Sequence, residues 1–247
     1  MTLPSDDPFS LSRLFHLNSE PWLNEDAYRA GPYLQSFRSH PDAPRMPLPA
    51  TAPLQVEALA AARRSVRAFR PDPMPLATLA ALLRTGYGLT GPDPMEQGGR
   101  FLRRSVPSAG GTYPLDIYAL VARVEGLTPG IYHFDAMGEA LELLRAGAWR
   151  HEAAPVFYTW PYVVDAPVIL CLVATFARTQ SKYGPRGYRY ILLEAGHAAQ
   201  NLCLGAVELG LASLCMGGFR DTALNRMLGL PQPDQGVVYT LALGAAA

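Results

Sequence analysis

Lys182 and Tyr183 could supply a base and an acid for proton transfer. They lie in a loop punctuated by glycine and proline, which leads into a long predicted helix. A lysine in a desolvated pocket can have a pKa near the working pH, and a neighbouring phenol can act as an acid or a relay. The alternative is that the pair is solvated surface, and these two residues alone leave both interpretations open.

A second cluster combines three guanidinium groups with a hydroxyl at the end of a predicted helix. Arginine donors form a planar fork that suits phosphate, and each charge-assisted hydrogen bond contributes about 1.5–3 kcal/mol. The alternative is that the cations only complement the helix C-terminus. The cluster consists of Arg63, Arg64, Ser65 and Arg67.

Two loops of small residues could let a planar ligand lie against the backbone, whose N–H groups would then face its heteroatoms. Neither loop matches a Rossmann fingerprint or a P-loop, so ordinary turns are the alternative. The first loop contains Pro107, Ser108, Ala109, Gly110 and Gly111, and the second contains Gly217 and Gly218.

No pair of residues has the spacing of a metal site, so none is predicted. Glu194 and His197 share one helix face but lack the second histidine of a zinc helix, and we interpret them as structural polar packing or a dimer contact. Cys171, Cys203 and Cys215 are odd in number, far apart in the sequence and surrounded by apolar residues. They are predicted to be buried free thiols.

The elements that position these residues predict an α+β fold, one sheet with helices packed on it. Apolar residues recur at helical spacing between Ile191 and Val207, and small residues there would let another backbone approach closely, within the domain or in a dimer. Residues 1–52 lack periodicity and are predicted to form an extended arm, with residues 53–247 as the domain. Helices are also predicted over 54–62, 76–87 and 222–228, and strands over 115–124, 130–135, 140–145, 166–175, 211–216 and 235–243, with a loop over 91–99 and no assignment over 149–164.

Composition and charge argue against several classes of protein. The 247 residues include 21 basic and 21 acidic residues, and this balance argues against a strongly basic nucleic-acid binder. The N-terminus has no charged-then-apolar leader, and the longest apolar run, residues 166–177, is too short for a bilayer. We therefore expect no membrane contact and a cytoplasmic location.

In their order along the chain, these pieces resemble the FMN-dependent nitroreductase family, and within it the SagB-type branch, over residues 54–244. The opening motif is Arg-Arg-Ser-Val-Arg-Ala-Phe, residues 63–69. Residues 103–118, 129–132 and 194–202 are similar to the SagB-type branch, which contains the azoline dehydrogenases of thiazole/oxazole-modified peptide biosynthesis. The joint order of these motifs is more specific than any one of them.

The resemblance implies a nitroreductase-like fold, with a central, mostly antiparallel sheet, flanking helices and a long central helix. It also implies a homodimer with two FMN sites at the subunit interface. The four residues of the arginine cluster would hold the phosphate and ribityl chain, and residues 107–110 of the other copy would border the flavin ring. Gly217 and Gly218 would lie near its reactive edge, and Lys182 and Tyr183 would be the Lys-Tyr pair that marks azoline dehydrogenases.

The chain departs from the resemblance in one respect. Many nitroreductases place a further arginine or lysine just after the last strand to complete the phosphate site, whereas residues 243–247 carry no cation. The phosphate would then rely on the first motif, assisted by Arg103 or Arg104, or flavin retention would be weak.

The implied reaction is the oxidation of thiazoline or oxazoline rings to thiazole or oxazole in a ribosomally made peptide. A ring hydride would pass to the flavin, Lys182 assisted by Tyr183 would remove the ring proton, and dioxygen would reoxidise the flavin. Two alternatives stay open: a general NAD(P)H-dependent FMN reductase of nitroaromatics or quinones, and a flavin-free scaffold of a peptide-modifying complex. A cyclodehydratase complex is a candidate partner.

Overall fold

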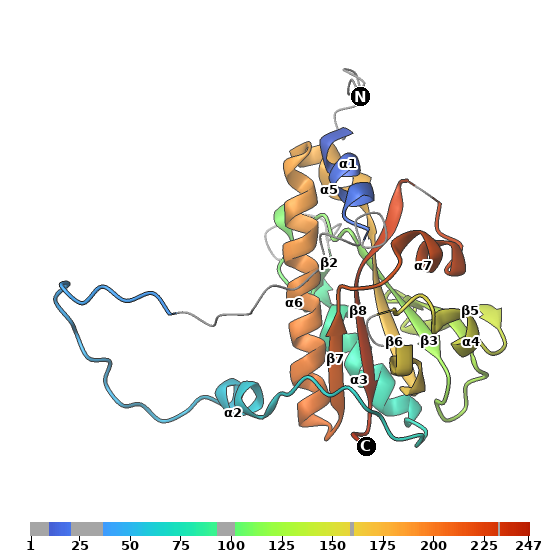
Figure 1. The fold of residues 1–247 in the computed structure, drawn as a ribbon, viewed down its shortest axis with the longest axis horizontal. Coiled ribbons are helices and arrows are strands. Elements are labelled where there is room, and N and C mark those ends of the chain that lie inside the picture. Colours follow the sequence, from blue (N-terminus) through green and yellow to red (C-terminus); the bar gives the residue numbers. More distant parts are fainter. Residues whose placement is uncertain (1–9, 21–36, 93–101, 159–160, 232) are drawn as a thin grey trace.

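A six-stranded sheet forms the centre of the molecule in the computed structural model (Figure 1). The structure describes residues 10–20, 37–92, 102–158, 161–231 and 233–247. Neighbouring strands follow the order β5-β4-β3-β6-β8-β7, and each pair is antiparallel, which confirms the predicted α+β class. The strands are β3 (Leu115–Val121), β4 (Gly130–Asp135), β5 (Ala140–Ala146), β6 (Val168–Thr175), β7 (Ala212–Met216) and β8 (Gln235–Gly244).

Helices cover both faces of this sheet and bury one hydrophobic cluster on each side. β6 lies in the middle, and all of its residues except Thr175 are buried, as expected of a strand covered on both faces. One face carries α3 (Leu76–Tyr87) and α6 (Arg186–Glu208), and the other carries α4 (Arg150–Ala153), η4 (Pro161–Asp165) and α7 (Asp221–Met227).

The small residues of α6 allow a close approach to α3. A Cβ on Gly86 of α3 would lie 2.6 Å from the Leu202 side chain, and a Cβ on Gly205 would lie 3.3 Å from Thr85. The close contact that the sequence predicted therefore joins two helices of the same domain. Leu192, one of the apolar residues that recur at helical spacing in this helix, is instead 39% exposed.

The N-terminal part of the chain contains a helix where an extended arm is predicted. α1 (Ser10–Asn18) docks on the body, where His16 Nδ1 lies 3.0 Å from the Tyr188 hydroxyl. Residues 37–54 contain no helix or strand and form an extended loop that lies away from the body and turns back towards it at α2 (Gln55–Ala62), which has no buried residue (Figure 1). The division of the chain at residue 52 stays a prediction.

Two further segments differ from the sequence prediction. The predicted loop over 91–99 begins inside β1 (Leu89–Pro92), which pairs with β2 (Leu102–Arg104), and residues 93–99 lie outside the described ranges. The unassigned segment 149–164 contains α4 and most of η4. No helix within the described ranges combines the length and apolar character that crossing a bilayer requires.

Candidate functional site

Lys182 and Tyr183 lie in the last turn of α5 (Phe176–Tyr183), not in the predicted loop. The glycine and proline after them separate two helices, because Gly184 has a φ of 57° and α6 begins at Arg186. A residue without a Cβ adopts this left-handed conformation without strain. The sequence therefore predicts the position of the pair, before the long helix, but not the element that carries it.

The loop 107–111 lies directly against this pair. Lys182 Nζ donates a hydrogen bond of 3.3 Å to the carbonyl oxygen of Gly110, although 72 positions separate the two residues. A Cβ on Gly110 would collide with the Tyr183 hydroxyl and lie 2.5 Å from Lys182 Nζ, and the φ of Gly110 is +60°. The backbone conformation thus favours glycine at this position, and a Cβ there would displace the ends of both side chains.

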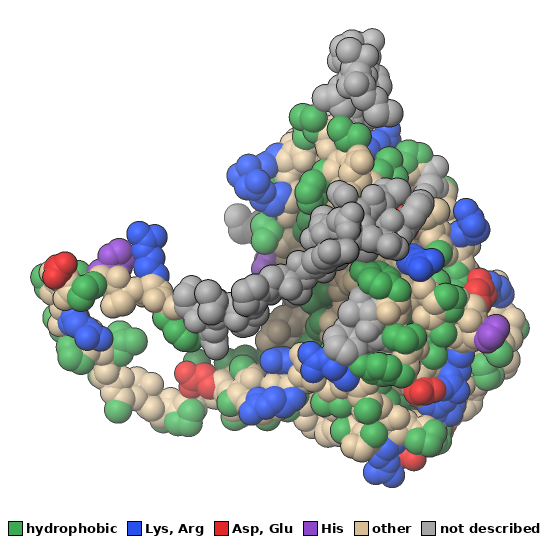
Figure 2. Space-filling view, viewed as in Figure 1, with side chains coloured by type: hydrophobic (Ala, Val, Ile, Leu, Met, Phe, Trp, Pro, Cys, Tyr) green, Lys and Arg blue, Asp and Glu red, His purple; other side chains and the backbone are tan. Residues whose placement is uncertain are grey.

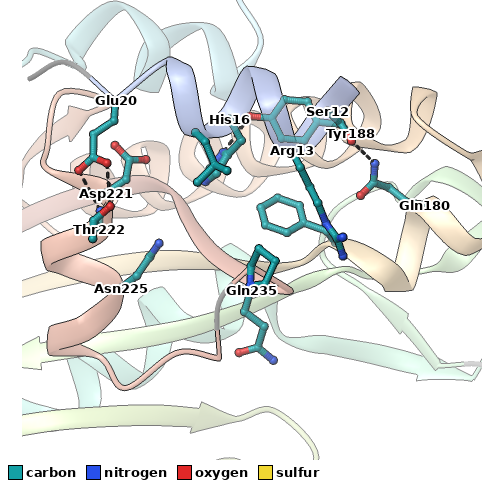
Figure 3. A pocket seen from close by; sticks show the side chains of 13 residues that line it. Ser12, Arg13, His16, Glu20, Gln180, Tyr188, Asp221, Thr222, Asn225 and Gln235 are labelled. Carbon is teal, nitrogen blue, oxygen red and sulfur yellow. Dashed lines mark hydrogen bonds between the residues drawn. The ribbon is translucent and has the colours of Figure 1, made fainter. Parts of the chain in front are cut away.

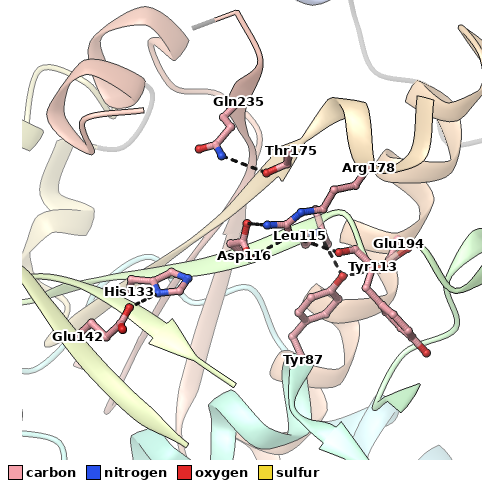
Figure 4. A network of polar contacts seen from close by, with 10 residues as sticks. All are labelled: Tyr87, Tyr113, Leu115, Asp116, His133, Glu142, Thr175, Arg178, Glu194 and Gln235. Atoms are coloured by element: carbon pink, nitrogen blue, oxygen red, sulfur yellow. Dashed lines mark hydrogen bonds and ion pairs between the residues drawn. The ribbon is translucent and has the colours of Figure 1, made fainter. Parts of the chain in front are cut away.

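Two further contacts fix the position of α5 beside the loop, and Figure 4 shows the first of them. Arg178 forms an ion pair of 3.0 Å with Asp116 of β3. The hydroxyl of Thr179 lies 2.7 Å from that of Thr112. Arg178 and Thr179 are one helical turn before Lys182 and share its side of α5, so these contacts set the position of the lysine.

The buried carboxylate of Glu194 contacts both the loop and α3, and Figure 4 shows its hydrogen bond with Tyr87 of α3. The hydroxyls of Tyr87 and Ser108 each donate a hydrogen bond of 2.6 Å to Glu194, and the Tyr113 N–H donates one of 2.9 Å to Ser108 Oγ. Burial raises the pKa of Glu194, and the bonds from Ser108 and Tyr87 partly offset this effect. The predicted packing role of Glu194 agrees with these contacts, whereas His197 is exposed.

Arg104 belongs to the same network. Its guanidinium carbon lies 4.5 Å from the centre of the Tyr87 ring, and its Nη1 donates a hydrogen bond of 2.7 Å to the Tyr87 carbonyl. Arg103 is exposed. Of the two arginines considered for completing a phosphate site, Arg104 is therefore bound to Tyr87 and Arg103 faces solvent.

The arginine cluster lies beside β7, the strand that also leads to the second loop of small residues. The Val66 N–H donates a hydrogen bond of 3.1 Å to the Ser213 carbonyl, and the backbones of Ser65 and Ser213 form a parallel β-bridge. Gly217 follows β7, four residues after Ser213, which corresponds to about 13 Å of extended strand. This spacing suits a ligand with a phosphate at one end and a ring system at the other.

These residues fit FMN in charge and in shape. Arg63 and Arg64 bond to the Ser65 hydroxyl and to backbone carbonyls, and within the described part of the chain neither pairs with a carboxylate. Figure 2 shows basic side chains gathered where the arm meets the body. A Cβ on Gly217 would have no atom within 4 Å, so the backbone there is open to a flat ring.

A small cavity lies beneath α1 (Figure 3). Its volume of about 20 Å³ has room for roughly one water molecule. Glu20 accepts hydrogen bonds of 3.0 and 2.8 Å from the N–H and hydroxyl of Thr222. Burial, and secondly Glu20, raise the pKa of Asp221 to about 7. The cavity is thus part of a polar docking contact for α1 and is too small for a peptide ring.

A feature of the composition, not used in the sequence analysis, also points to Lys182. Lys182 is the only lysine among the 21 lysines and arginines of the chain. A guanidinium keeps its proton in proteins, whereas an ammonium can lose it, so this chain has one long cationic side chain able to titrate. Lys182 is exposed in the single chain, and the desolvated pocket expected from the sequence therefore needs a cofactor or a second copy to close it.

Comparison with known proteins gives a consistent result. The sequence pattern of the nitroreductase family matches residues 60–245. A Methanocaldococcus jannaschii protein named as a nitroreductase, MJ1384, is 34% identical over 191 residues, 77% of this chain and 92% of that protein. The Escherichia coli microcin B17-processing protein McbC and the Rhizobium leguminosarum trifolitoxin-processing protein TfxB are each 27% identical, over 63% and 68% of this chain. The chain spans about half of the length of these two relatives, 56% and 48%.

Two solved structures share the fold. A chain of the E. coli microcin synthetase McbBCD complex with truncated pro-MccB17 bound gives a TM-score of 0.71 at 20% identity, covering 97% of this chain and 93% of that chain. A nitroreductase from Desulfovibrio desulfuricans in complex with FMN gives 0.56 at 16% identity, covering 79% and 88%. The expected nitroreductase-like fold, with its antiparallel sheet and long central helix, is confirmed.

Proposed function

Because the chain belongs to the nitroreductase family, a family of oxidoreductases, we propose that it is an FMN-dependent dehydrogenase that oxidises thiazoline or oxazoline rings of ribosomally made peptides. The observation that carries the proposal is the contact of Lys182 and Tyr183 with Gly110. This contact places Lys182, the proposed proton acceptor, beside the loop that is expected to border the flavin ring. The processing names of McbC and TfxB support a peptide substrate, and the McbBCD structure supports a complex, for which a cyclodehydratase is a candidate partner.

The residues of this chain would hold the cofactor and move protons. When bound, FMN supplies the acceptor for the ring hydride. Lys182 Nζ would accept the ring proton, and the adjacent Tyr183 hydroxyl would assist. Gly217 leaves room for the ring edge, Gly218 would lie near that edge, and residues 107–110 would exclude water from it. The phosphate and ribityl chain would be held by Arg63, Arg64, Ser65 and Arg67.

A second copy of the chain would complete each site. The arginine cluster and β7 form one group of site residues, and α5 with the loop 107–111 forms another, as two subunits facing each other would require. Apolar side chains are exposed at the start of α2 and on α6: Leu54 by 65%, Val56 by 50% and Leu193 by 55%. Exposed apolar surface of this kind marks protein contacts. Light scattering is expected to give twice 26.8 kDa, and an active monomer would contradict the shared site.

The purified protein is expected to show a flavin spectrum and to release FMN at near one molecule per chain. Incubated with peptides that contain a thiazoline or an oxazoline, it should remove two hydrogens from the ring, which mass spectrometry detects. If the protein binds FMN but neither ring loses this mass, the dehydrogenase activity is rejected, while the assignment to the nitroreductase family still holds. A protein that takes up no FMN would reject the cofactor assignment itself.

The match to MJ1384 favours a second candidate function, a general FMN reductase of nitroaromatics or quinones. Such an enzyme takes its hydride from NAD(P)H, whereas a dehydrogenase takes it from the peptide ring. Rapid bleaching of the flavin by NAD(P)H without oxygen would support the reductase. Bleaching by an azoline peptide alone would support the dehydrogenase.

A further inference from the structure

Cys203 of α6 and Cys215 of β7 lie side by side, although 12 positions separate them in the sequence. Their Sγ atoms are 3.3 Å apart. Cys203 is 3% exposed and Cys215 is half-buried, whereas Cys171 is completely buried in β6. All three thiols are free, as predicted, but two of them form a pair and one of these is not fully buried.

The surroundings favour a thiolate on one of the two sulfurs. A hydrogen bond from Cys215 lowers the pKa of Cys203 against the effect of burial, and Ser213 and the Arg63 guanidinium lower it further. The same pairing and burial raise the pKa of Cys215, to which the Tyr239 side chain is also hydrogen-bonded. A thiolate with a thiol beside it is the arrangement that thiol–disulfide chemistry requires.

We propose that Cys203 and Cys215 are a redox-active dithiol, which a hydroperoxide converts to a disulfide bond between α6 and β7. The Cys203 thiolate attacks a peroxide oxygen and the O–O bond breaks. The leaving hydroxide takes up the proton that the Cys203 thiol released on ionising, and forms water. The Cys215 sulfur then attacks the resulting sulfenic acid, the S–S bond forms, and the S–O bond breaks to release water. In sum, two thiols and one hydrogen peroxide give one disulfide and two waters.

The fold needs little change to reach this product. A disulfide bond is about 2.05 Å long, so sulfurs at 3.3 Å must approach by roughly 1 Å. The bond would form next to Ser213, whose carbonyl accepts the Val66 N–H beside the arginine cluster. Hydrogen peroxide is the two-electron reduction product of dioxygen, the expected electron acceptor. The inference rests on the proposed function only for this source of hydrogen peroxide, and the pairing of the two thiols does not depend on it.

Peroxide treatment of the full-length holoenzyme tests the dithiol. After denaturation and alkylation, the treated protein is expected to have lost two of its three thiols. Peptide mapping should recover a linked Cys203–Cys215 peptide, which dithiothreitol separates. Cys171 is the internal control, because it is completely buried and burial raises its pKa; it should be alkylated in both samples.

Retention of all three thiols, or oxidation of Cys203 to sulfinic acid without a linked peptide, would overturn the proposal. Cys171→Ser should still give the linked peptide. Cys215→Ser should stop at a Cys203 sulfenic acid, which dimedone traps; a Cys203 that dimedone does not label would argue against the first step. These readouts are chemical, so they stand whether or not the protein oxidises azolines.

Discussion

Replacing Lys182 with alanine is expected to lower the rate of azoline oxidation by about 10²–10⁴, the typical contribution of a positioned base, while the protein keeps its FMN. Within the described residues, the Lys182 ammonium forms no ion pair, and its one hydrogen bond, to the Gly110 carbonyl, is 3.3 Å long. Its loss should therefore leave the fold intact. The rate is measured by mass spectrometry of the peptide, and flavin content by absorbance.

Lys182→Arg separates proton transfer from charge. Arginine keeps a positive charge at a similar distance but does not release its proton, so the arginine variant should be as slow as the alanine variant. A rate restored by arginine would make Lys182 a cationic contact instead of a base. Loss of flavin together with activity would make it a cofactor contact. Ser181→Ala, an exposed neighbour on α5, is the matched control and should retain the wild-type rate.

The sheet and the long helices follow from local sequence patterns. β4 and α3 begin and end at the predicted residues, because a proline precedes each element and turn-forming residues follow it. α1 is different, since nine residues do not form a stable helix by themselves. The contact of His16 with Tyr188, and that of Glu20 just after the helix with Thr222, stabilise it. Both depend on segments distant in the sequence.

In the candidate site too, some features follow from the local sequence and others depend on contacts between distant segments. Residue chemistry alone singles out the arginine cluster and the Lys-Tyr pair, and the resemblance gives them roles that stay predictions. The contact between Gly110 and Lys182 depends on how α5 lies beside β3. The approach of Cys203 to Cys215 depends on how α6 lies over β7. Neither arrangement has a local signal, so only the fold reveals them.

Replacing Gly110 with alanine is expected to lower the rate of azoline oxidation by about 10², the order of loss that a misplacement of roughly 1 Å causes. The new Cβ would occupy the space of the Tyr183 hydroxyl and of Lys182 Nζ. Both atoms are the far ends of flexible side chains, so they can move away at little cost in stability. The variant should therefore fold but hold its proton-transfer groups in the wrong place.

Gly111→Ala is the matched control for this effect. Gly110 and Gly111 have similar φ angles, +60° and +67°, but a Cβ on Gly111 would have no atom within 4 Å. Alanine should cost about 1–3 kcal/mol of backbone strain at either position, so both variants should show a similar fall in melting temperature. Only Gly110→Ala should lose activity with its flavin retained. Equal losses of activity would instead assign the effect to the loop backbone, and unchanged activity in both would show that the contact with Lys182 and Tyr183 does not position them for the reaction.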